Sequence, residues 1–218
     1  MLLWFFSAAL AAQEYQIETV ATGLEHPWSI AWLPDGTALI TERVGRLRWL
    51  REGRLLDEPV TGVPDVLAVS QGGLFEALPD PEYAENGWIY LSYAHGERGA
   101  NGTRVLRARL RNGALVDQDI LFTARPLKAQ PVHYGGRMAF LADGTLVIGL
   151  GDGFDLREQA QALDNHFGKI VRIRRDGGIP DDNPFVDTDN ALPEIWSLGH
   201  RNVQGLVLDP ETSRLWAH

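Results

Sequence analysis

The residue best suited to chemistry in this sequence is a histidine beside two glycines. His133 lies in the segment QPVHYGGRMAF, where Gly135 and Gly136 lack side chains that would keep a ligand away from the backbone. A neutral imidazole that titrates near neutral pH is the usual acceptor of a proton from an alcohol. His133 is therefore a candidate general base. The alternative interpretation is a histidine that only fills the entrance of a strand.

Two further polar segments precede apolar runs in the same way. Gln71 comes before the run LFEAL, and Arg201 with Asn202 comes before the run QGLVL. Arg201 would supply a fixed cation for a carboxylate or for an oxygen that gains negative charge during a reaction. If the three segments hold matching places in a structural repeat, their polar groups converge at one end of its axis.

The elements that must position these residues are short strands. Apolar and polar residues alternate in short runs separated by turn residues, which indicates an all-β protein. Asp35, Asn86, Asp143 and Asp209 occupy equivalent turns, at spacings of 51, 57 and 66 residues. Periods of about 50 residues made of short antiparallel strands indicate the blades of a β-propeller.

Two stretches interrupt the repeat. Residues Asp155 to Asn165 have the Gln, Ala and Leu content of a short helix, and residues Gly177 to Leu192 are typical of a long acidic loop. We interpret the first as an insertion on one face of the propeller, where propellers tend to carry function.

The length of the repeat predicts an incomplete ring. The three spacings average 58 residues, so the chain supplies about three and a half blades, whereas closed propellers usually have four to eight. An open ring leaves an unpaired strand edge, a feature that natural sheets avoid. We therefore expect residues 13–218 to be part of a propeller domain that is cut off at its C-terminal end.

The N-terminal segment and the composition bear on location and partners. Residues 1–12 are apolar and end in an Ala-x-Ala pattern, which predicts a signal peptide and a periplasmic or secreted protein, although no Lys or Arg precedes Arg43. The segment is too short for a stable membrane span. A net charge of −9 argues against nucleic acid as a partner. The absence of cysteine excludes thiol chemistry.

The residues themselves do not define a metal site. The six histidines show neither H-x-H nor H-E-x-x-H spacing, and residues 187–190 lack the glycine and the terminal glutamate of a calcium-binding loop. The Gly-x-Gly patterns at residues 149–153 are not followed by a βαβ unit, so they do not predict a dinucleotide site.

Several motifs together resemble the soluble quinoprotein aldose sugar dehydrogenases, also called the glucose/sorbosone dehydrogenase family. In the family's order, the motifs are GLEHPWSIAWLPDG, QGGL, VHYGGRMAF, LGDG, GKIVRI and LGHRNVQGL. The resemblance implies a six-bladed propeller that binds pyrroloquinoline quinone (PQQ) with a calcium ion. It also implies oxidation of the C1 hydroxyl of aldose sugars to lactones, with electrons passed to an external acceptor.

The same resemblance implies roles for individual residues. His133 matches the general base that takes the hydroxyl proton while a hydride moves to the quinone. Arg201 and Asn202 match the pair that contacts the quinone and stabilises its reduced oxygen, and Gln71 matches a quinone-contacting glutamine. Asp152 lies in the loop that borders the sugar pocket, which makes it the candidate for substrate binding.

The sequence differs from the family's pattern at three points, which limits the roles that the resemblance implies. Val132 stands where the glucose-oxidising branch has an acid, so the broader aldose-oxidising branch fits better. The calcium-binding glycine-proline segment and the basic residues that clamp the quinone carboxylates would follow His218. We therefore expect this chain alone to bind quinone weakly or not at all, and to be inactive.

Two other functions are compatible with a propeller. Calcium-dependent lactonases use the same fold, but their metal is held by carboxylates and amides in the channel. Gln71, His133 and Arg201 form a set poor in such anionic ligands. A non-catalytic binding propeller is the other alternative.

Overall fold

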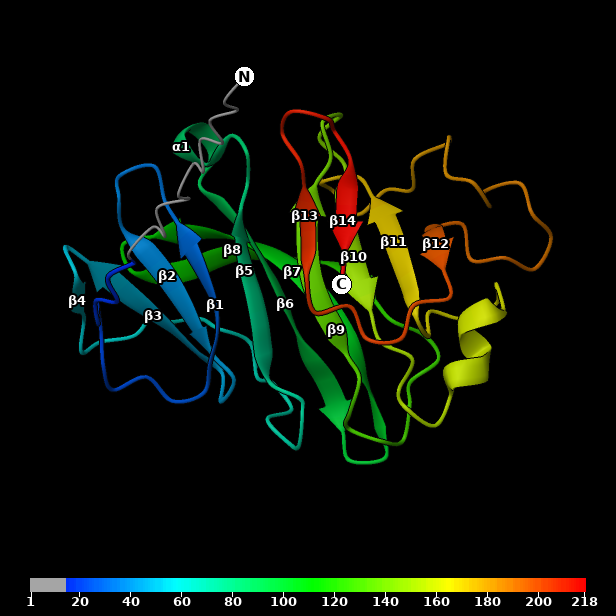
Figure 1. Cartoon of the computed structure of the whole chain (residues 1–218), viewed down its shortest axis with the longest axis horizontal. Coiled ribbons are helices and arrows are strands. Elements are labelled where there is room, and N and C mark those ends of the chain that lie inside the picture. The colour runs from blue at the N-terminus through cyan, green and yellow to red at the C-terminus, as the bar shows by residue number, and fades with distance from the viewer. Residues whose placement is uncertain (1–14) are drawn as a thin grey trace, which may run out of the picture.

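The computed structural model describes residues 15–218, so the signal peptide predicted at residues 1–12 lies outside the described part. Four antiparallel sheets follow one another along the chain (Figure 1). The strands are β1 (Pro27–Trp32), β2 (Ala38–Glu42), β3 (Arg46–Arg51) and β4 (Arg54–Leu55) in the first sheet; β5 (Leu74–Pro79), β6 (Trp88–Glu97), β7 (Ala100–Arg111) and β8 (Ala114–Thr123) in the second; β9 (Gly135–Phe140), β10 (Leu146–Leu150), β11 (Lys169–Ile173) and β12 (Ile195–Leu198) in the third; and β13 (Leu206–Leu208) and β14 (Leu215–Ala217) in the fourth. Helix α1 (Tyr83–Asn86) joins β5 to β6, and the 3-10 helix η1 (Arg157–Gln161) lies between β10 and β11.

The arrangement of the sheets is that of propeller blades. Within each sheet the strands pair in sequence order, so each sheet is a simple meander. The first strand of each sheet contacts the first strand of the next, from β1 through β5 and β9 to β13. Strands in such a row are the innermost strands of blades around a common axis. The prediction of an all-β propeller with about three and a half blades is confirmed for the described residues.

The turn residues that defined the repeat hold equivalent places in the structure. Asp35, Asn86, Asp143 and Asp209 each lie between the first and second strand of a sheet. In all four, the side-chain Oδ1 accepts a hydrogen bond of 2.9 Å from the backbone N–H two residues later. These are Asx turns, in which the side chain replaces a backbone acceptor. The repeat read from the sequence therefore follows the blades.

The core lies between neighbouring sheets. Strand β10 is buried on both faces, and alternate residues point to different neighbours. Leu146, Ile148 and Leu150 pack against the second sheet, whereas Val147 packs with Val203 ahead of the fourth sheet. This two-sided burial explains why the strand reads as a continuous apolar run.

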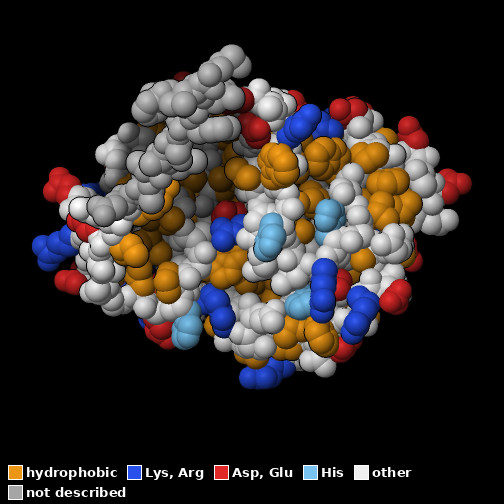
Figure 2. Space-filling view, viewed as in Figure 1, with side chains coloured by type: hydrophobic (Ala, Val, Ile, Leu, Met, Phe, Trp, Pro, Cys, Tyr) orange, Lys and Arg blue, Asp and Glu red, His pale blue; other side chains and the backbone are white. Residues whose placement is uncertain are grey.

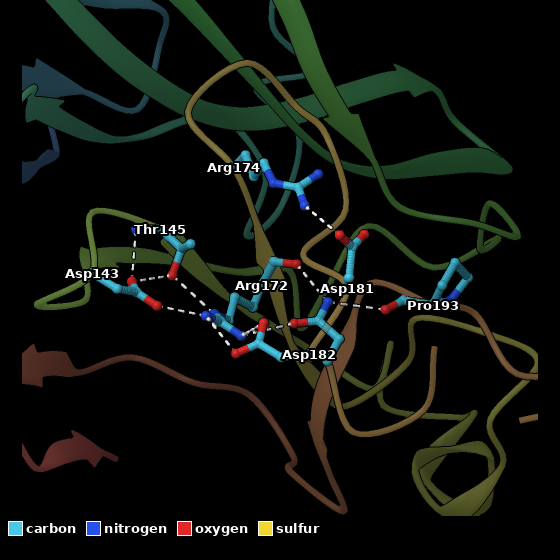
Figure 3. Close-up of polar contacts among 8 residues, drawn as sticks. Asp143, Thr145, Arg172, Arg174, Asp181, Asp182 and Pro193 are labelled. Carbon is cyan, nitrogen blue, oxygen red and sulfur yellow. Dashed lines mark hydrogen bonds and ion pairs between the residues drawn. The ribbon is translucent and has the colours of Figure 1, made fainter. Parts of the chain in front are cut away.

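The two segments that interrupt the repeat both connect strands of the third sheet, and a buried cation binds each of them. The predicted short helix forms as η1, where the fully buried ammonium of Lys169 donates to the carbonyls of Gln159, Ala160 and Phe167. The predicted long loop connects β11 to β12. Its start is held by the buried Arg172 (Figure 3).

Arg172 connects this loop to the Asx turn of the same sheet. Its guanidinium lies 2.5 Å from the Asp143 carboxylate and 2.8 Å from the Asp182 carboxylate (Figure 3). Asn183 adds hydrogen bonds from its Nδ2 to the carbonyls of Arg172 and Pro193, both at 3.0 Å. The guanidinium satisfies the acidic groups around it, so this cluster acts as an anchor for the loop.

None of the helices in the part of the chain that the structure describes has the length and apolar content needed to cross a membrane.

Candidate active site

The predicted site residues come from three sheets and meet at one end of the inner strands. Gln71 precedes β5, His133 precedes β9, and Arg201 with Asn202 precedes β13. Asp152 follows β10. The structure brings Gln71 and Asn202 into hydrogen-bond contact with the His133 segment, whereas the Arg201 side chain is exposed near Phe154.

Side-chain amides lock the backbone around His133. The Gln71 Oε1 accepts the backbone N–H of His133 at 2.9 Å, and the Asn202 Oδ1 accepts the backbone N–H of Gly135 at 3.0 Å. His133 itself adopts a φ of 50°, a strained value for a residue with a side chain. Three blades thus hold the histidine in a backbone conformation that it would not favour alone.

The imidazole is oriented by a buried carboxylate. The His133 Nδ1 lies 2.7 Å from the Asp152 Oδ1, and Asp152 is only 2% exposed. The same oxygen accepts the backbone N–H of Phe154 at 2.8 Å, and the backbone N–H of Asp152 donates to the Arg201 carbonyl at 2.7 Å. An acceptor at Nδ1 favours the tautomer with the proton on that nitrogen, which leaves Nε2 as the free base.

This burial bears on the predicted role of Asp152. A carboxylate that faces the histidine and is closed off from solvent is suited to holding the imidazole. Direct contact between Asp152 and a substrate stays a prediction, and the geometry favours a positioning role instead.

Phe154 is a neighbour of the histidine that the sequence did not single out. Its ring meets the His133 ring edge-on at a centroid distance of 5.2 Å, and it is 44% exposed. Its backbone has a φ of 70°, which is rare for an aromatic residue. The exposed Arg201 places its guanidinium carbon 5.9 Å from the centre of this ring, which brings Arg201 to the same rim. An aromatic residue directly after the LGDG motif was the available signal.

The two glycines serve packing. A Cβ on Gly136 would lie 2.8 Å from the ring of Phe75, and a Cβ on Gly135 would lie 2.4 Å from the Gly149 carbonyl oxygen. Both have positive φ, at 107° and 69°. Glycine is therefore required because β9 lies tightly against β5 and β10, and Gly135 also lines the cavity described next, so ligand access to its backbone stays a prediction.

A cavity of about 260 Å³ lies beside this histidine segment. Trp28, Phe75 and Tyr134 form an aromatic wall, with ring centroids 5.5 Å and 5.4 Å apart along the series. The remaining lining residues are Arg43, Gln71, Gly135, Asn202 and Gln204. None of these lining residues is a carboxylate.

Two of the amide groups in the cavity lining keep their donors available. Gln71 and Asn202 each use the side-chain oxygen on a backbone N–H, as described above, so the NH₂ group of each is left for another acceptor. With Arg43, the cavity therefore combines hydrogen-bond donors, one cation and an aromatic wall. Such a cavity favours a planar anion. Figure 2 shows Lys, Arg and His side chains in the lower middle of the viewed face, with Asp and Glu side chains among them.

A buried lysine supports the wall from behind. The Lys128 ammonium lies 3.4 Å from the centre of the Tyr134 ring and donates to the Asn101 Oδ1 and the Gln130 carbonyl, both at 2.8 Å. The Tyr134 hydroxyl donates to the same Asn101 oxygen at 2.7 Å. Burial lowers the pKa of Lys128 to about 7. No sequence pattern marked this residue.

The described residues contain no side-chain cluster suited to a metal ion. Within residues 15–218, no group of three or more His, Asp or Glu side chains is arranged to hold a metal ion.

The sequence is similar to proteins of known family. A family model described as Glucose / Sorbosone dehydrogenase matches residues 24–218. The aldose sugar dehydrogenase YliI of Escherichia coli is 42% identical over 92% of this chain and 55% of its own length. The chain therefore spans about half the length of this curated relative.

Solved structures agree with this comparison. The crystal structure of the soluble aldose sugar dehydrogenase from E. coli in the apo form superposes with a TM-score of 0.87 at 41% identity, over 92% of this chain and 58% of that one. The PQQ-bound aldose sugar dehydrogenase from Streptomyces coelicolor gives a TM-score of 0.78 at 30% identity, again over 92% and 58% of the two chains.

Proposed function

The chain belongs to the glucose/sorbosone dehydrogenase family of oxidoreductases, and on this premise we propose that it carries the proton-accepting part of the active site of a PQQ-dependent aldose sugar dehydrogenase. The observation that carries the proposal is the His133–Asp152 pair next to a cavity free of carboxylates. PQQ, when bound, supplies the acceptor for the hydride that leaves C1 of the sugar.

The cavity fits the cofactor in its chemistry. PQQ is planar and carries several carboxylates, which suit an aromatic wall and a set of donors with no competing acid. Gln71 and Asn202 would donate to it through their free NH₂ groups. Arg201 lies at the rim beside Phe154, and we assign it to the stabilisation of negative charge that develops on the reduced cofactor oxygen.

His133 would act as the general base. Its Nε2 accepts the proton of the C1 hydroxyl, while the Nδ1–H stays hydrogen-bonded to Asp152. The buried carboxylate then stabilises the imidazolium that forms and keeps the ring in place. Loss of this proton and of the hydride converts the hemiacetal carbon of the sugar into the carbonyl of a lactone.

Location, acceptor and metal follow as parts of the same proposal. The apolar residues 1–12 support export to the periplasm or the medium. Electrons would leave the reduced cofactor for an external acceptor. No cluster of His, Asp or Glu side chains within the described residues is arranged to hold calcium, so no step is assigned to it.

A dye-linked assay tests this function. The longest product of the gene is purified without PQQ, and aldose oxidation is followed with and without added PQQ. We expect turnover only with PQQ, lactone as the product, and little or no turnover by residues 1–218 alone. Hydrolysis of lactones without PQQ would favour a lactonase, and the absence of both activities would favour a binding propeller.

A further inference from the structure

Arg43 lines the cavity from the first sheet, and the family resemblance assigned it no role. It directly follows β2 and is fixed between two sheets: its backbone N–H donates to the His26 carbonyl, and its carbonyl accepts the Leu74 N–H, both at 3.1 Å. Its Nη2 donates to the Ser70 carbonyl at 2.5 Å. The guanidinium is therefore held next to Gln71, at the edge of the cavity.

The charge of Arg43 has no partner within residues 15–218. The buried Glu42 pairs with Arg46 at 2.6 Å and with Arg48 at 3.5 Å, and Glu25 pairs with Arg46 at 2.7 Å. Both carboxylates are thus paired with neighbouring arginines. Arg43 makes no ion pair in the described part of the chain, and its Nε is buried without a hydrogen-bond partner.

A cation in this position calls for an anion. A buried donor left unpaired costs free energy, and this cost is recovered when a charged acceptor binds. The other lining residues are aromatic residues, amides and a glycine, so Arg43 is the one cation among the residues that line the cavity. The alternative is a purely structural role, in which Arg43 only donates its hydrogen bond to the Ser70 carbonyl.

We propose that Arg43 is a further cofactor-binding residue, which receives a carboxylate of PQQ from the first blade. This inference rests on the proposed function. It adds one basic side chain to the amide donors of Gln71 and Asn202 in the same cavity.

The test is a binding titration. PQQ is added to the longest product of the gene, and the Kd is measured by equilibrium dialysis and by quenching of tryptophan fluorescence, since Trp28 lies in the cavity wall. We expect R43Q to raise the Kd about tenfold or more, because a charge-assisted hydrogen bond is lost. R43K keeps the positive charge but lacks the planar guanidinium, so its Kd should fall between those of wild type and R43Q. R54Q removes the same charge from an exposed strand and should leave the Kd unchanged.

The outcomes separate the two proposals. Saturable binding by the wild type with an unchanged Kd in R43Q would overturn the role of Arg43 and leave the proposed function intact. No saturable binding by the wild type would overturn both. If R43Q does not fold, phenylglyoxal modification of the wild type decides: PQQ should protect Arg43 and not Arg54, and equal modification of Arg43 with and without PQQ would refute the inference.

Discussion

At the scale of residues, the site consists of groups whose positions are fixed before any ligand arrives. His133 is held through its backbone by Gln71 and through its ring by Asp152 and Phe154. Fixed geometry of this kind lowers the reorganisation needed during proton transfer. The strained φ of His133 is maintained by these contacts.

Lys128 gives a pH-dependent prediction at the same scale. Burial lowers the pKa of Lys128 from 10.5 to about 7. Between these values the unfolded chain binds more protons than the folded chain, so the free energy of unfolding rises with pH across this window. Below pH 7 the folded protein carries the full cost of a buried ammonium. Replacement by methionine removes this contribution, which is at most about 5 kcal/mol.

The measurement is urea unfolding of wild type and K128M between pH 6.5 and 10. The variant should gain stability relative to wild type as the pH falls, even if lost hydrogen bonds to Asn101 and Gln130 shift both ends of the curve. Burial also lowers the pKa of Lys169 to about 8. Both proteins keep this lysine, so its contribution cancels in the difference between their free energies of unfolding. Parallel curves for the two proteins would contradict the prediction.

At the scale of elements, the sequence predicted the strands and the turns but not the contacts between blades. The four Asx residues could be found because an Asx turn is a local structure, complete within three residues. The short helix and the long loop were also visible in local composition. Residues such as Gln71 and His133 could be aligned because the repeat relates them by rotation.

The rest of the site depends on distances between sheets. Three features arise where segments far apart in sequence meet. They are the burial of Asp152, the guanidinium of Arg43 without an ion pair in the described residues, and the contact of Lys128 with the Tyr134 ring. The packing role of Gly136 could not be found either, because the Phe75 ring that requires a glycine there belongs to the preceding sheet. No period or motif encodes such a contact.

The packing role of Gly136 leads to a prediction. G136A places a Cβ 2.8 Å from the buried ring of Phe75 and also strains the backbone at a φ of 107°. Gly36 has a φ of 81° and nothing within 4 Å of its would-be Cβ, so G36A reports backbone strain alone. We expect G136A to lower the free energy of unfolding by about 1–3 kcal/mol more than G36A. Equal losses in denaturant unfolding would show that the space beside Gly136 is not limiting.

At the scale of the whole molecule, the sheets at both ends of the arc keep exposed apolar faces. Ile30 and Trp32 are exposed on β1, and Val207 and Trp216 are exposed on β13 and β14. In a closed propeller such faces pack against neighbouring blades. The chain spans about half the length of its curated relative, so these exposed faces correspond to the ends of the matched part.

In the proposed reaction, His133 takes the proton of the sugar while other residues hold the cofactor. The most direct measurement is single-turnover reduction of bound PQQ by an aldose, followed by absorbance in a rapid-mixing instrument, for wild type and H133Q. We predict that H133Q binds PQQ with the wild-type Kd but reduces it about 10²–10⁴ times more slowly. The rate of PQQ reduction in D152N should fall between those of wild type and H133Q, because D152N keeps the base and loses the buried carboxylate that orients it. An unchanged rate of reduction in H133Q would contradict the account.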